Sequence, residues 1–405
     1  MRRRELLKYL SMLPAGGLIT PYVDVNQLLW TGKQRAGREL FKELGVRTFI
    51  NAAGTYTAMT GSLMRPEVLE AINYSAQDFC MLDELQDKVG EKIAELVHAE
   101  SAVVTAGCFS AMTLGLAGIL TGIDEEKATQ LPHLQGTNMK SEVICQKGHE
   151  IVYTHALKNT GCNIVMVETR EELEQAINER TALMFFLNVQ ADRGQIMHKE
   201  WVAIAKKHGV PTMIDIAADV PPVSNLWKFH EMGFDLVCVS GGKAIRGPQS
   251  AGLLMGKKNF VQAARLHMPP RGFNIGRGMK VNKEEVLGMY VALEKFVHLD
   301  HQREWELQKQ QVDLIAMAAK TVDGVTTEIK TPPLGNVTPT LHIHWNPEKV
   351  KISGKELQQR LRAGNPSIEI GGAEDKSLVL TAWMLKPGQE KVVAKRLREE
   401  LSTVV

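Results

Sequence analysis

The chain has 405 residues, a length that favours a two-domain enzyme over a single small module. Its 48 basic and 46 acidic residues leave a formal net charge of +2, which argues against a protein whose main task is to bind nucleic acid, because such domains are usually strongly basic. The five cysteines are odd in number and include no C-x-x-C pair, so they are typical of reduced thiols in the cytoplasm rather than of a disulfide framework.

Residues 1–45 are expected to form an N-terminal arm. Arg3 and Arg4, followed by Leu6 and Leu7, resemble a twin-arginine export signal, but the apolar run that follows is short and interrupted by prolines. A basic amphipathic helix that packs on a partner subunit is the favoured interpretation and predicts a cytoplasmic protein. Export of the folded protein through the twin-arginine pathway is the alternative. No stretch of the sequence approaches the roughly 20 apolar residues of a membrane span.

Residues 46–281 alternate between helical patterns and short apolar runs. The helical patterns cover 66–97, 110–120, 151–159, 171–179 and 199–209. The expected strands cover 101–107, 142–148, 163–168, 181–189, 211–217, 234–239 and 251–255. Strands that are apolar throughout and alternate with helices predict a large α/β domain, in which a parallel sheet is covered on both faces.

Residues 282–405 are expected to form a long connecting helix over 283–320 and a small C-terminal α+β domain. The latter has apolar strands over 338–345 and 376–383 and a final helix from Gly388. His342 and His344 fall on one face of the first of these strands, but no further metal ligands can be named. We therefore interpret both histidines as structural and expect no metal site.

Residues 105–112 combine a strand end with a helix start. The strand ends at Gly107 and the helix begins at once, so free backbone N–H groups and the positive end of the helix face outward. Thr105 and Ser110 can add hydroxyl donors. This pattern indicates a phosphate cradle, and an ordinary turn capped by Ser110 is the alternative.

Two further side chains follow apolar strands. The imidazole of His149 could lie flat against a ring in the site, although a lone histidine is more often structural. Asp215 ends a buried strand, where an unpaired carboxylate is costly, and a protonated ring nitrogen would be a suitable partner. Pairing with backbone N–H groups or with a basic side chain is the alternative. Asp219, in the following loop beside Pro221, is the competing acid.

Lys243 stands on a Ser-Gly-Gly platform between two apolar strands. Burial disfavours the ammonium form of a lysine, and a neutral amine can form a Schiff base with an aldehyde. Ser240, three residues earlier, could reach a phosphate. A phosphate seat, a ring-stacking group, an acid for a pyridinium nitrogen and an amine for an aldehyde together indicate pyridoxal 5′-phosphate (PLP) as the cofactor.

Five motifs carry a resemblance to a known family over about residues 40–400. They are INAAGTYT, VTAGCFSAM, IDIAAD, VSGGKAIRGPQSAGLL and GRGMKVNKEEVLGMYVALE. The sequence resembles the fold-type I PLP-dependent enzymes of the selenocysteine synthase (L-seryl-tRNA selenium transferase)-like family, and within it the D-glucosaminate-6-phosphate ammonia-lyase branch. The resemblance implies an aspartate aminotransferase-like large domain with a mainly parallel, seven-stranded type of sheet. It also implies a homodimer or larger homo-oligomer with sites at the subunit interface.

The resemblance also implies roles for single residues. Lys243 would be the Schiff-base lysine, Asp215 the partner of the pyridinium nitrogen, and His149 the group that stacks on the ring. The phosphate contacts would be Gly107, Cys108 and Ser240, with Ser110 in the same turn. The basic residues expected near the substrate are Arg271, Arg277 and Lys280. Phe109 departs from the family, since small residues are usual at that position.

The predicted reaction is α,β-elimination from a 2-amino-3-hydroxy acid, such as an amino-sugar acid phosphate, with a 2-keto acid and ammonia as products. Lys243 would take the Cα proton while the protonated ring absorbs the charge. Selenium transfer is an alternative that needs a tRNA-binding surface, and no basic tract suggests one. Transamination is a second alternative. The expected partner is therefore a small molecule rather than nucleic acid.

Overall fold

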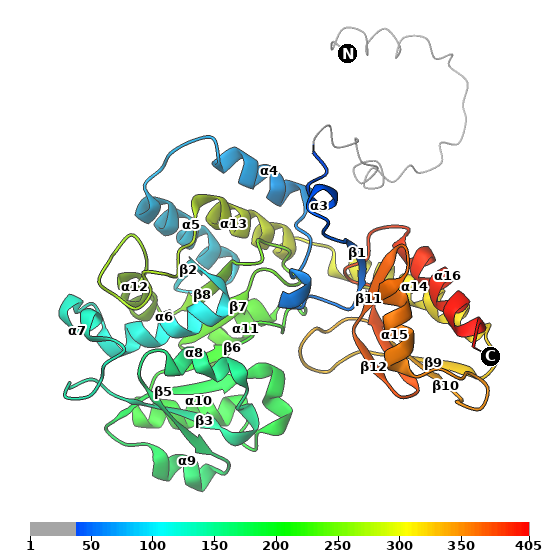
Figure 1. The fold of residues 1–405 in the computed structure, drawn as a ribbon. Helices are drawn as coiled ribbons and strands as arrows, with labels where there is room; N and C mark the ends of the chain where they lie inside the picture. Colours follow the sequence, from blue (N-terminus) through cyan, green and yellow to red (C-terminus); the bar gives the residue numbers. More distant parts are fainter. Residues whose placement is uncertain (1–37, 405) are drawn as a thin grey trace, which may run out of the picture. The chain divides into compact units, whose positions relative to one another are not determined.

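The structure, a computed structural model, describes residues 38–404, and the chain divides into two units, residues 1–48 and 49–405. In the first unit the described part holds one short helix, α3 (Leu40–Glu43), whose Glu43 side chain accepts hydrogen bonds from Arg38. The arginine pair that resembles an export signal lies outside the described residues. Figure 1 shows the order of the elements along the chain.

A seven-stranded sheet forms the centre of the larger part of the second unit. Its strands, in spatial order, are β2 (Ser101–Thr105), β8 (Gly252–Gly256), β7 (Leu236–Ser240), β6 (Thr212–Asp215), β5 (Thr181–Leu187), β3 (Glu142–Gln146) and β4 (Asn163–Val167). Strand β8 runs antiparallel to both of its neighbours, whereas the other pairings are parallel. The predicted mainly parallel sheet is confirmed.

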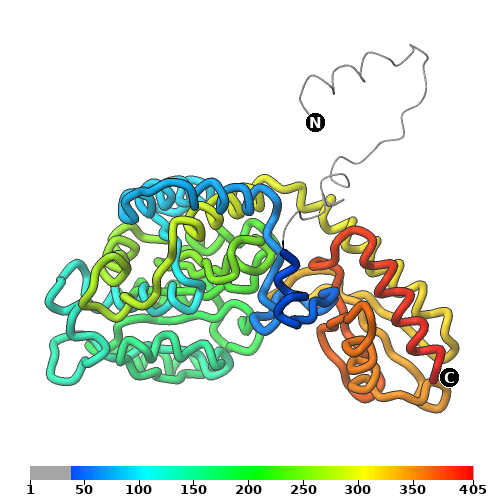
Figure 2. Tube along the Cα trace, turned by 45° about the horizontal axis from the view of Figure 1, so that its top comes forward, coloured from blue at the N-terminus to red at the C-terminus, as the bar shows by residue number. Residues whose placement is uncertain are grey.

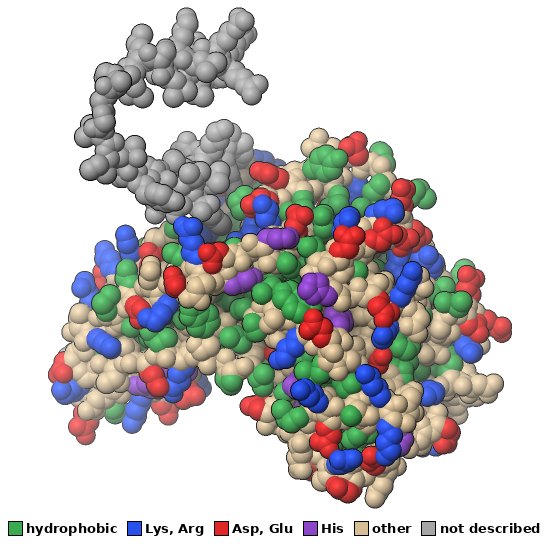
Figure 3. Space-filling model, turned by 180° about the vertical axis from the view of Figure 1, so that it is seen from behind, with side chains coloured by type: hydrophobic (Ala, Val, Ile, Leu, Met, Phe, Trp, Pro, Cys, Tyr) green, Lys and Arg blue, Asp and Glu red, His purple; other side chains and the backbone are tan. Residues whose placement is uncertain are grey.

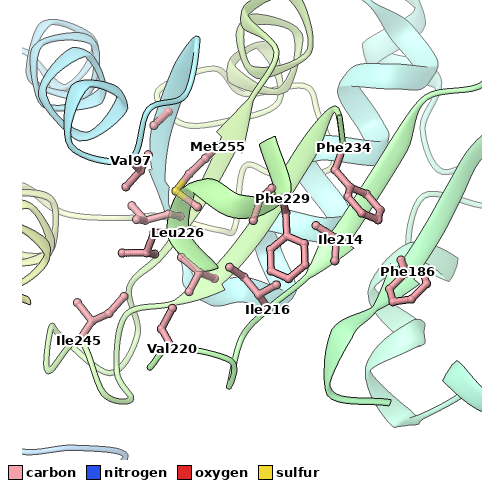
Figure 4. Packing of buried hydrophobic residues seen from close by; sticks show 14 of the residues in the cluster. Val97, Phe186, Ile214, Ile216, Val220, Leu226, Phe229, Phe234, Ile245 and Met255 are labelled. Carbon is pink, nitrogen blue, oxygen red and sulfur yellow. The ribbon is translucent and has the colours of Figure 1, made fainter. Parts of the chain in front are cut away.

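Successive residues of these strands enter two different hydrophobic layers, because side chains alternate between the faces of a sheet. Phe186, Ile214 and Val237 pack on one face with residues of α5 (Leu82–Leu96), α10 (His198–His208), α11 (Asn225–Met232) and α13 (Lys283–Val297). Figure 4 shows Phe186 and Ile214 among Phe229 and Phe234 in this layer.

The other face is covered by α6 (Gly107–Thr121), α8 (His155–Lys158) and α12 (Lys258–Leu266). Helix α6 packs against β8, β7 and β5, and almost all of its residues are buried. At Gly118 an added Cβ would lie 2.5 Å from the backbone nitrogen of Ala264, so glycine allows α12 to pack directly on α6. Burial of β5 along its whole length follows from this coverage on both faces.

The C-terminal part has its own antiparallel sheet, in the order β12 (Gly372–Glu374), β13 (Ser377–Thr381), β10 (Thr340–Trp345) and β9 (Val325–Lys330). Helices α14 (His301–Lys320), α15 (Gly354–Ala363) and α16 (Gln389–Ser402) pack with it around a separate hydrophobic core. Figure 2 shows α14 and α16 side by side.

Strand β1 (Phe49–Ala52) pairs in parallel with β11 (Ser367–Ile370) of the C-terminal part. The sequence had placed residues 49–52 in the stretch expected to form the large domain. Their pairing differs from that expectation because strand partners are chosen by tertiary packing, and β1 itself carries no signal for a partner so distant along the chain.

Three expected helices differ from the structure. The expected helix over 283–320 is two helices, α13 and α14, and the side chain of Asp300 caps the second by accepting the backbone N–H of Arg303 at 3.0 Å. The pattern over 66–97 divides into α4 (Pro66–Ser75) and α5. The stretch 151–159 holds a 3-10 turn and the short helix α8. Apolar spacing continued across each break, whereas local caps and turns decide where a helix ends.

No helix within residues 38–404 is long and apolar enough to cross a membrane. His342 and His344 lie with their rings stacked at 6.4 Å on β10, and His342 borders Glu328 and Lys330 of the neighbouring strand.

Candidate active site

Four of the predicted site residues lie at one edge of the seven-stranded sheet. Asp215 ends β6, Ser240 ends β7, His149 follows β3, and Cys108 lies in the first turn of α6 directly after β2. Because these four strands run parallel, their carboxyl ends meet at the same edge, where ligands of open α/β sheets bind.

Asp215 is the buried acid of this edge, with 4% of its surface exposed. Its Oδ1 accepts hydrogen bonds from the backbone N–H of Ala217 at 2.7 Å and from the thiol of Cys108 at 3.4 Å. Burial raises the pKa of Asp215, whereas the Ala217 N–H, the positive charge of Lys243 and the Cys108 thiol lower it. The carboxylate is therefore shielded from water but lies near the positive charge of Lys243.

Asp219 is the second buried acid, and it lies in the loop that follows β6. Its Oδ1 accepts the backbone N–H of Gly335 at 3.1 Å, and the side chain is 2% exposed. Burial raises the pKa of Asp219 to about 6, with a further contribution from the charge of Asp215. Asp219 thus joins the sheet edge to the C-terminal part, whereas Asp215 ends a strand beside Lys243.

Lys243 stands on a glycine platform after β7. Gly241 donates its N–H to Ala251 O at 2.9 Å, and at Gly242 an added Cβ would lie 2.5 Å from the Cα of Gln249. The backbone of the platform therefore packs against the segment that leads into β8, and a larger residue at Gly242 would push that segment away. Lys243 itself is half-buried, on a backbone that packing holds in place.

The start of α6 forms a cradle of backbone N–H groups. The helix begins at Gly107, where the cradle prediction placed its start and three residues before the helical pattern over 110–120, and no side chain caps its first turn. Gly252 of β8 faces this turn, and a Cβ added there would lie 2.5 Å from the carbonyl carbon of Gly107. Uncapped N–H groups at a helix start bind phosphate well, so the donor set fits the phosphate of PLP.

Cys108 has a contact that the sequence did not predict. Its thiol donates to Asp215 Oδ1 at 3.4 Å. The expected contact of Cys108 with a phosphate is compatible with this bond, because the backbone N–H can make it, and it stays a prediction. The two residues lie 107 positions apart, on different elements, and local sequence carries no sign of their contact. Burial raises the pKa of the Cys108 thiol well above its usual value, so it stays protonated as a donor.

His149 lies in the interior, with none of its surface exposed. Its Nδ1 accepts the backbone N–H of Leu187 at 3.3 Å, and its ring meets Phe186 edge to face, with centroids 4.5 Å apart. Burial lowers its pKa to about 4, so the ring is neutral at pH 7. These contacts favour the structural alternative over stacking on a cofactor.

The basic residues expected near the substrate lie on the segment 267–282 between α12 and α13. Arg271 pairs with Asp83 in the first turn of α5 at 3.1 Å. Arg277 and Lys280 are exposed. Within residues 38–404, no hydrogen bond or ion pair joins any of the three to Asp215 or Lys243, so their role near the substrate stays a prediction.

Arg246 is a residue of this region that the sequence analysis did not single out. It follows Lys243 by three positions, has a φ of 60°, and donates from Nη2 to the carbonyl oxygen of Trp383 at 2.6 Å. The signal available in the sequence was an arginine directly before Gly-Pro, three residues after the candidate lysine, in KAIRGP.

A sheet in which one antiparallel strand is inserted beside the first strand of an otherwise parallel set, with an acid and a lysine at its carboxyl edge, is the frame of fold-type I PLP-dependent enzymes. The chain has this fold and is an enzyme of that class. Residues 80–276 match the family model described as Aminotransferase class-V.

Three of the curated relatives are named for three different activities. The chain is 27% identical to a D-glucosaminate-6-phosphate ammonia lyase of Salmonella typhimurium, over 89% of this chain and 97% of the relative. It is 26% identical to a 5'-C-glycyluridine monooxygenase-decarboxylase of a Streptomyces species, over 89% and 92%. An L-seryl-tRNA(Sec) selenium transferase of Proteus mirabilis is 23% identical, over 66% and 62%.

Solved structures also resemble this chain. A structure of D-glucosaminate-6-phosphate ammonia-lyase superposes with a TM-score of 0.80 at 26% identity, and the alignment covers 91% of this chain and 99% of that one. A serine palmitoyltransferase of S. paucimobilis with bound PLP gives a TM-score of 0.55 at 15% identity over 89% of each chain, and this likeness shows the fold alone.

Proposed function

We propose that this enzyme is a PLP-dependent ammonia-lyase that acts on a 2-amino-3-hydroxy acid, with a phosphorylated amino-sugar acid as its substrate class. The observation that carries the proposal is the buried acid Asp215 beside Lys243. It occurs in a chain whose alignment covers 97% of the length of an ammonia lyase of that kind. The products would be a 2-keto acid and ammonia.

The chain's own residues divide the chemistry among them. PLP, when bound, supplies an electron sink for the charge that develops at the substrate Cα. Lys243 would take the Cα proton, and Asp215 would hold a proton at the pyridine nitrogen. The first turn of α6 and Ser240 would bind the phosphate. The β-hydroxyl leaves as water, and a water molecule then hydrolyses the C–N bond. The net change is therefore release of ammonia.

A small substrate is favoured over tRNA by the charge distribution. The net charge is +2, and on the face shown in Figure 3 the blue basic side chains are interspersed with red acidic ones. A tRNA substrate would need many phosphate contacts from clustered basic residues.

The test is to incubate the PLP-loaded enzyme with 2-amino-3-hydroxy acids, including phosphorylated amino-sugar acids, and to measure ammonia and keto acid. Equal amounts of both products are expected, and Lys243→Ala should abolish them. Uptake of oxygen with the substrate would indicate monooxygenase chemistry. Conversion of an added keto acid into an amino acid would indicate transamination, and tight, salt-sensitive binding of seryl-tRNA would indicate selenium transfer.

The lysine assignment has its own test. The PLP-loaded protein should be yellow, and borohydride reduction followed by peptide mapping should place the pyridoxyl group on Lys243. Lys257 is a suitable comparison because it lies on the same stretch of chain but pairs with Glu100 at 2.6 Å. A label on Lys257 would refute the assignment.

We further propose that the enzyme is a homodimer whose interface includes the segments 74–81 and 267–282. Tyr74, Phe79, Met81 and Phe273 expose 69–103% of their surface on these segments, and exposed apolar side chains gathered in this way mark interaction surfaces. The segments are neighbours, because Arg271 of the second pairs with Asp83 directly after the first.

The proposed location is the cytoplasm. All five cysteines are free, and four of them are buried, as expected for a protein that folds in a reducing compartment. Fractionation of cells that produce the full-length protein would test this, since recovery from an exported fraction would support the twin-arginine alternative.

A further inference from the structure

A cavity of about 280 Å³ lies beside the turn that follows Lys243. Ala244 and Arg246 of that turn line it, together with Arg65 at the start of α4, His301 at the start of α14, and Trp383 after β13. The proposed elimination assigns no task to these side chains. The cavity is of interest because the turn that lines it directly follows Lys243.

Two arginines line this cavity, and Glu304 of α14 lines it as well. Burial and the neighbouring charge of Arg65 lower the pKa of Arg246 to about 10. Glu304 acts on Arg246 in the opposite direction, but within residues 38–404 neither arginine forms an ion pair with an acid. Two positive charges that repel each other in a partly buried site are unfavourable unless an anion neutralises them.

Three hydrogen-bond donors around the cavity also have no acceptor. These are Arg65 Nε, Trp383 Nε1 and, when it carries the proton, His301 Nε2, each buried and without a partner. Trp383 is 5% exposed, and its indole can only donate. Buried polar groups nearly always have partners, so the shared deficiency points to a missing group that accepts several hydrogen bonds.

The backbone of Arg246 supports a function for its side chain. Its φ of 60° lies in the left-handed region, where glycine is preferred. Its N–H donates to Lys243 O at 3.0 Å and closes the turn, a bond that glycine would also make. An arginine kept in a strained conformation is typical of a site where the side chain is needed.

We propose that Arg65 and Arg246 bind an oxyanion, the phosphate or carboxylate group of a small molecule, in this cavity. Guanidinium groups bind such groups through paired hydrogen bonds, and Trp383 and His301 supply further donors. The anion neutralises the two charges. It is either the distal acid group of the substrate or a free anion that binds beside the catalytic turn.

The test is calorimetric titration of the PLP-loaded protein with inorganic phosphate, so that the cradle at α6 is already filled. We expect saturable binding that weakens at least tenfold in Arg65→Gln and in Arg246→Gly. The second substitution suits the positive φ and should not strain the turn. Arg180→Gln is the matched control, because Arg180 is an exposed arginine paired with Glu142 at 2.6 Å, and it should bind phosphate as the unsubstituted protein does.

Thermal unfolding gives a second readout. Phosphate should raise the melting temperature of the unsubstituted protein and of Arg180→Gln, but not that of the two cavity variants. Absence of saturable binding, or equal affinity in all four proteins, would overturn the proposal. Because neither measurement needs turnover, the site can fail while the proposed elimination stands, and the reverse also holds.

The two sources of the anion are separated by inhibition kinetics. Phosphate that competes with the substrate, raising KM at constant kcat, assigns the cavity to the substrate's acid group. Phosphate that changes kcat without competing assigns it to a free anion. Under either assignment, inhibition by phosphate should be lost in Arg246→Gly. Inhibition that persists unchanged in this variant would contradict the proposed anion site.

Discussion

At the scale of single residues, Asp215 and Asp219 differ in position more than in burial. Both are nearly inaccessible, but Asp215 ends a strand and is close to Lys243, whereas Asp219 is bonded to the backbone of Gly335. Asp215→Asn should therefore keep PLP bound while turnover falls by about 10² or more, because an amide cannot hold a proton on the ring nitrogen. Steady-state kinetics with a PLP titration would measure this. A larger loss in Asp219→Asn would identify Asp219 as the acid.

Asp219 should also make stability depend on pH. Burial raises its pKa to about 6, above the value of 3.8 expected in an unfolded chain. Between these values the folded protein keeps a proton that the unfolded chain has lost, so stability decreases as pH rises from about 4 through 6. The loss is about 3 kcal/mol at most, at about 1.4 kcal/mol for each unit.

The Asp219→Asn variant provides the measurement. An amide has no charge to bury. The melting temperature of the variant, relative to that of the unsubstituted protein, should therefore rise between pH 4 and pH 7. A constant difference over this range would mean that Asp219 does not carry the expected shift.

Cys108 positions Asp215 through a thiol hydrogen bond to Oδ1. Cys108→Ala removes this donor and should lower kcat by about fivefold, in line with about 1 kcal/mol for a single hydrogen bond. Cys108→Ser keeps a donor of similar size and should retain most of the activity. A pH profile of kcat that is identical in all three proteins would argue against a link between the thiol and the acid.

At the scale of elements, the break between α13 and α14 depends on one cap. Asp300→Ala removes the acceptor for the Arg303 N–H and should destabilise the protein by about 1 kcal/mol, as measured by the midpoint of urea unfolding. Asp313→Ala is the control on the same helix. It breaks only an exposed pair with Lys309 and should cost about 0.5 kcal/mol or less. Equal effects would show that the cap does not define the helix start.

The strands of the large sheet could be predicted from the sequence because burial on both faces makes them apolar throughout. Their spatial order could not be predicted from it, since apolar strands do not identify their neighbours, and β8 enters the sheet next to β2 in the antiparallel direction. The helix breaks at 76–81 and 298–300 were missed for a related reason. Apolar spacing continues across them, and the turns that end the helices depend on contacts.

At the scale of the whole molecule, the exposed segments 74–81 and 267–282 should be covered by a second copy of the chain. Sedimentation or light scattering should give twice the chain mass of 44.9 kDa, or a larger multiple. Phe79→Ser with Phe273→Ser should shift the protein toward the monomer, because it removes two of the most exposed apolar side chains. Ile123→Ser is the control, as an exposed apolar residue on neither segment. A monomeric parent protein would contradict the proposal.

The sequence by itself determined the α/β class and the cofactor, and it nominated Asp215 as the acid and Lys243 as the lysine, assignments that stay predictions. Each depends on local pattern: apolar strands, a helix start after glycine, and polar residues directly after strands. The tertiary structure alone decided which groups meet. The Cys108–Asp215 bond, the enclosure of His149, the pairing of β1 with β11 and the cavity of Arg65 and Arg246 all join residues far apart in the chain. Such contacts arise when packed layers bring distant segments together, and a single sequence carries no local record of them.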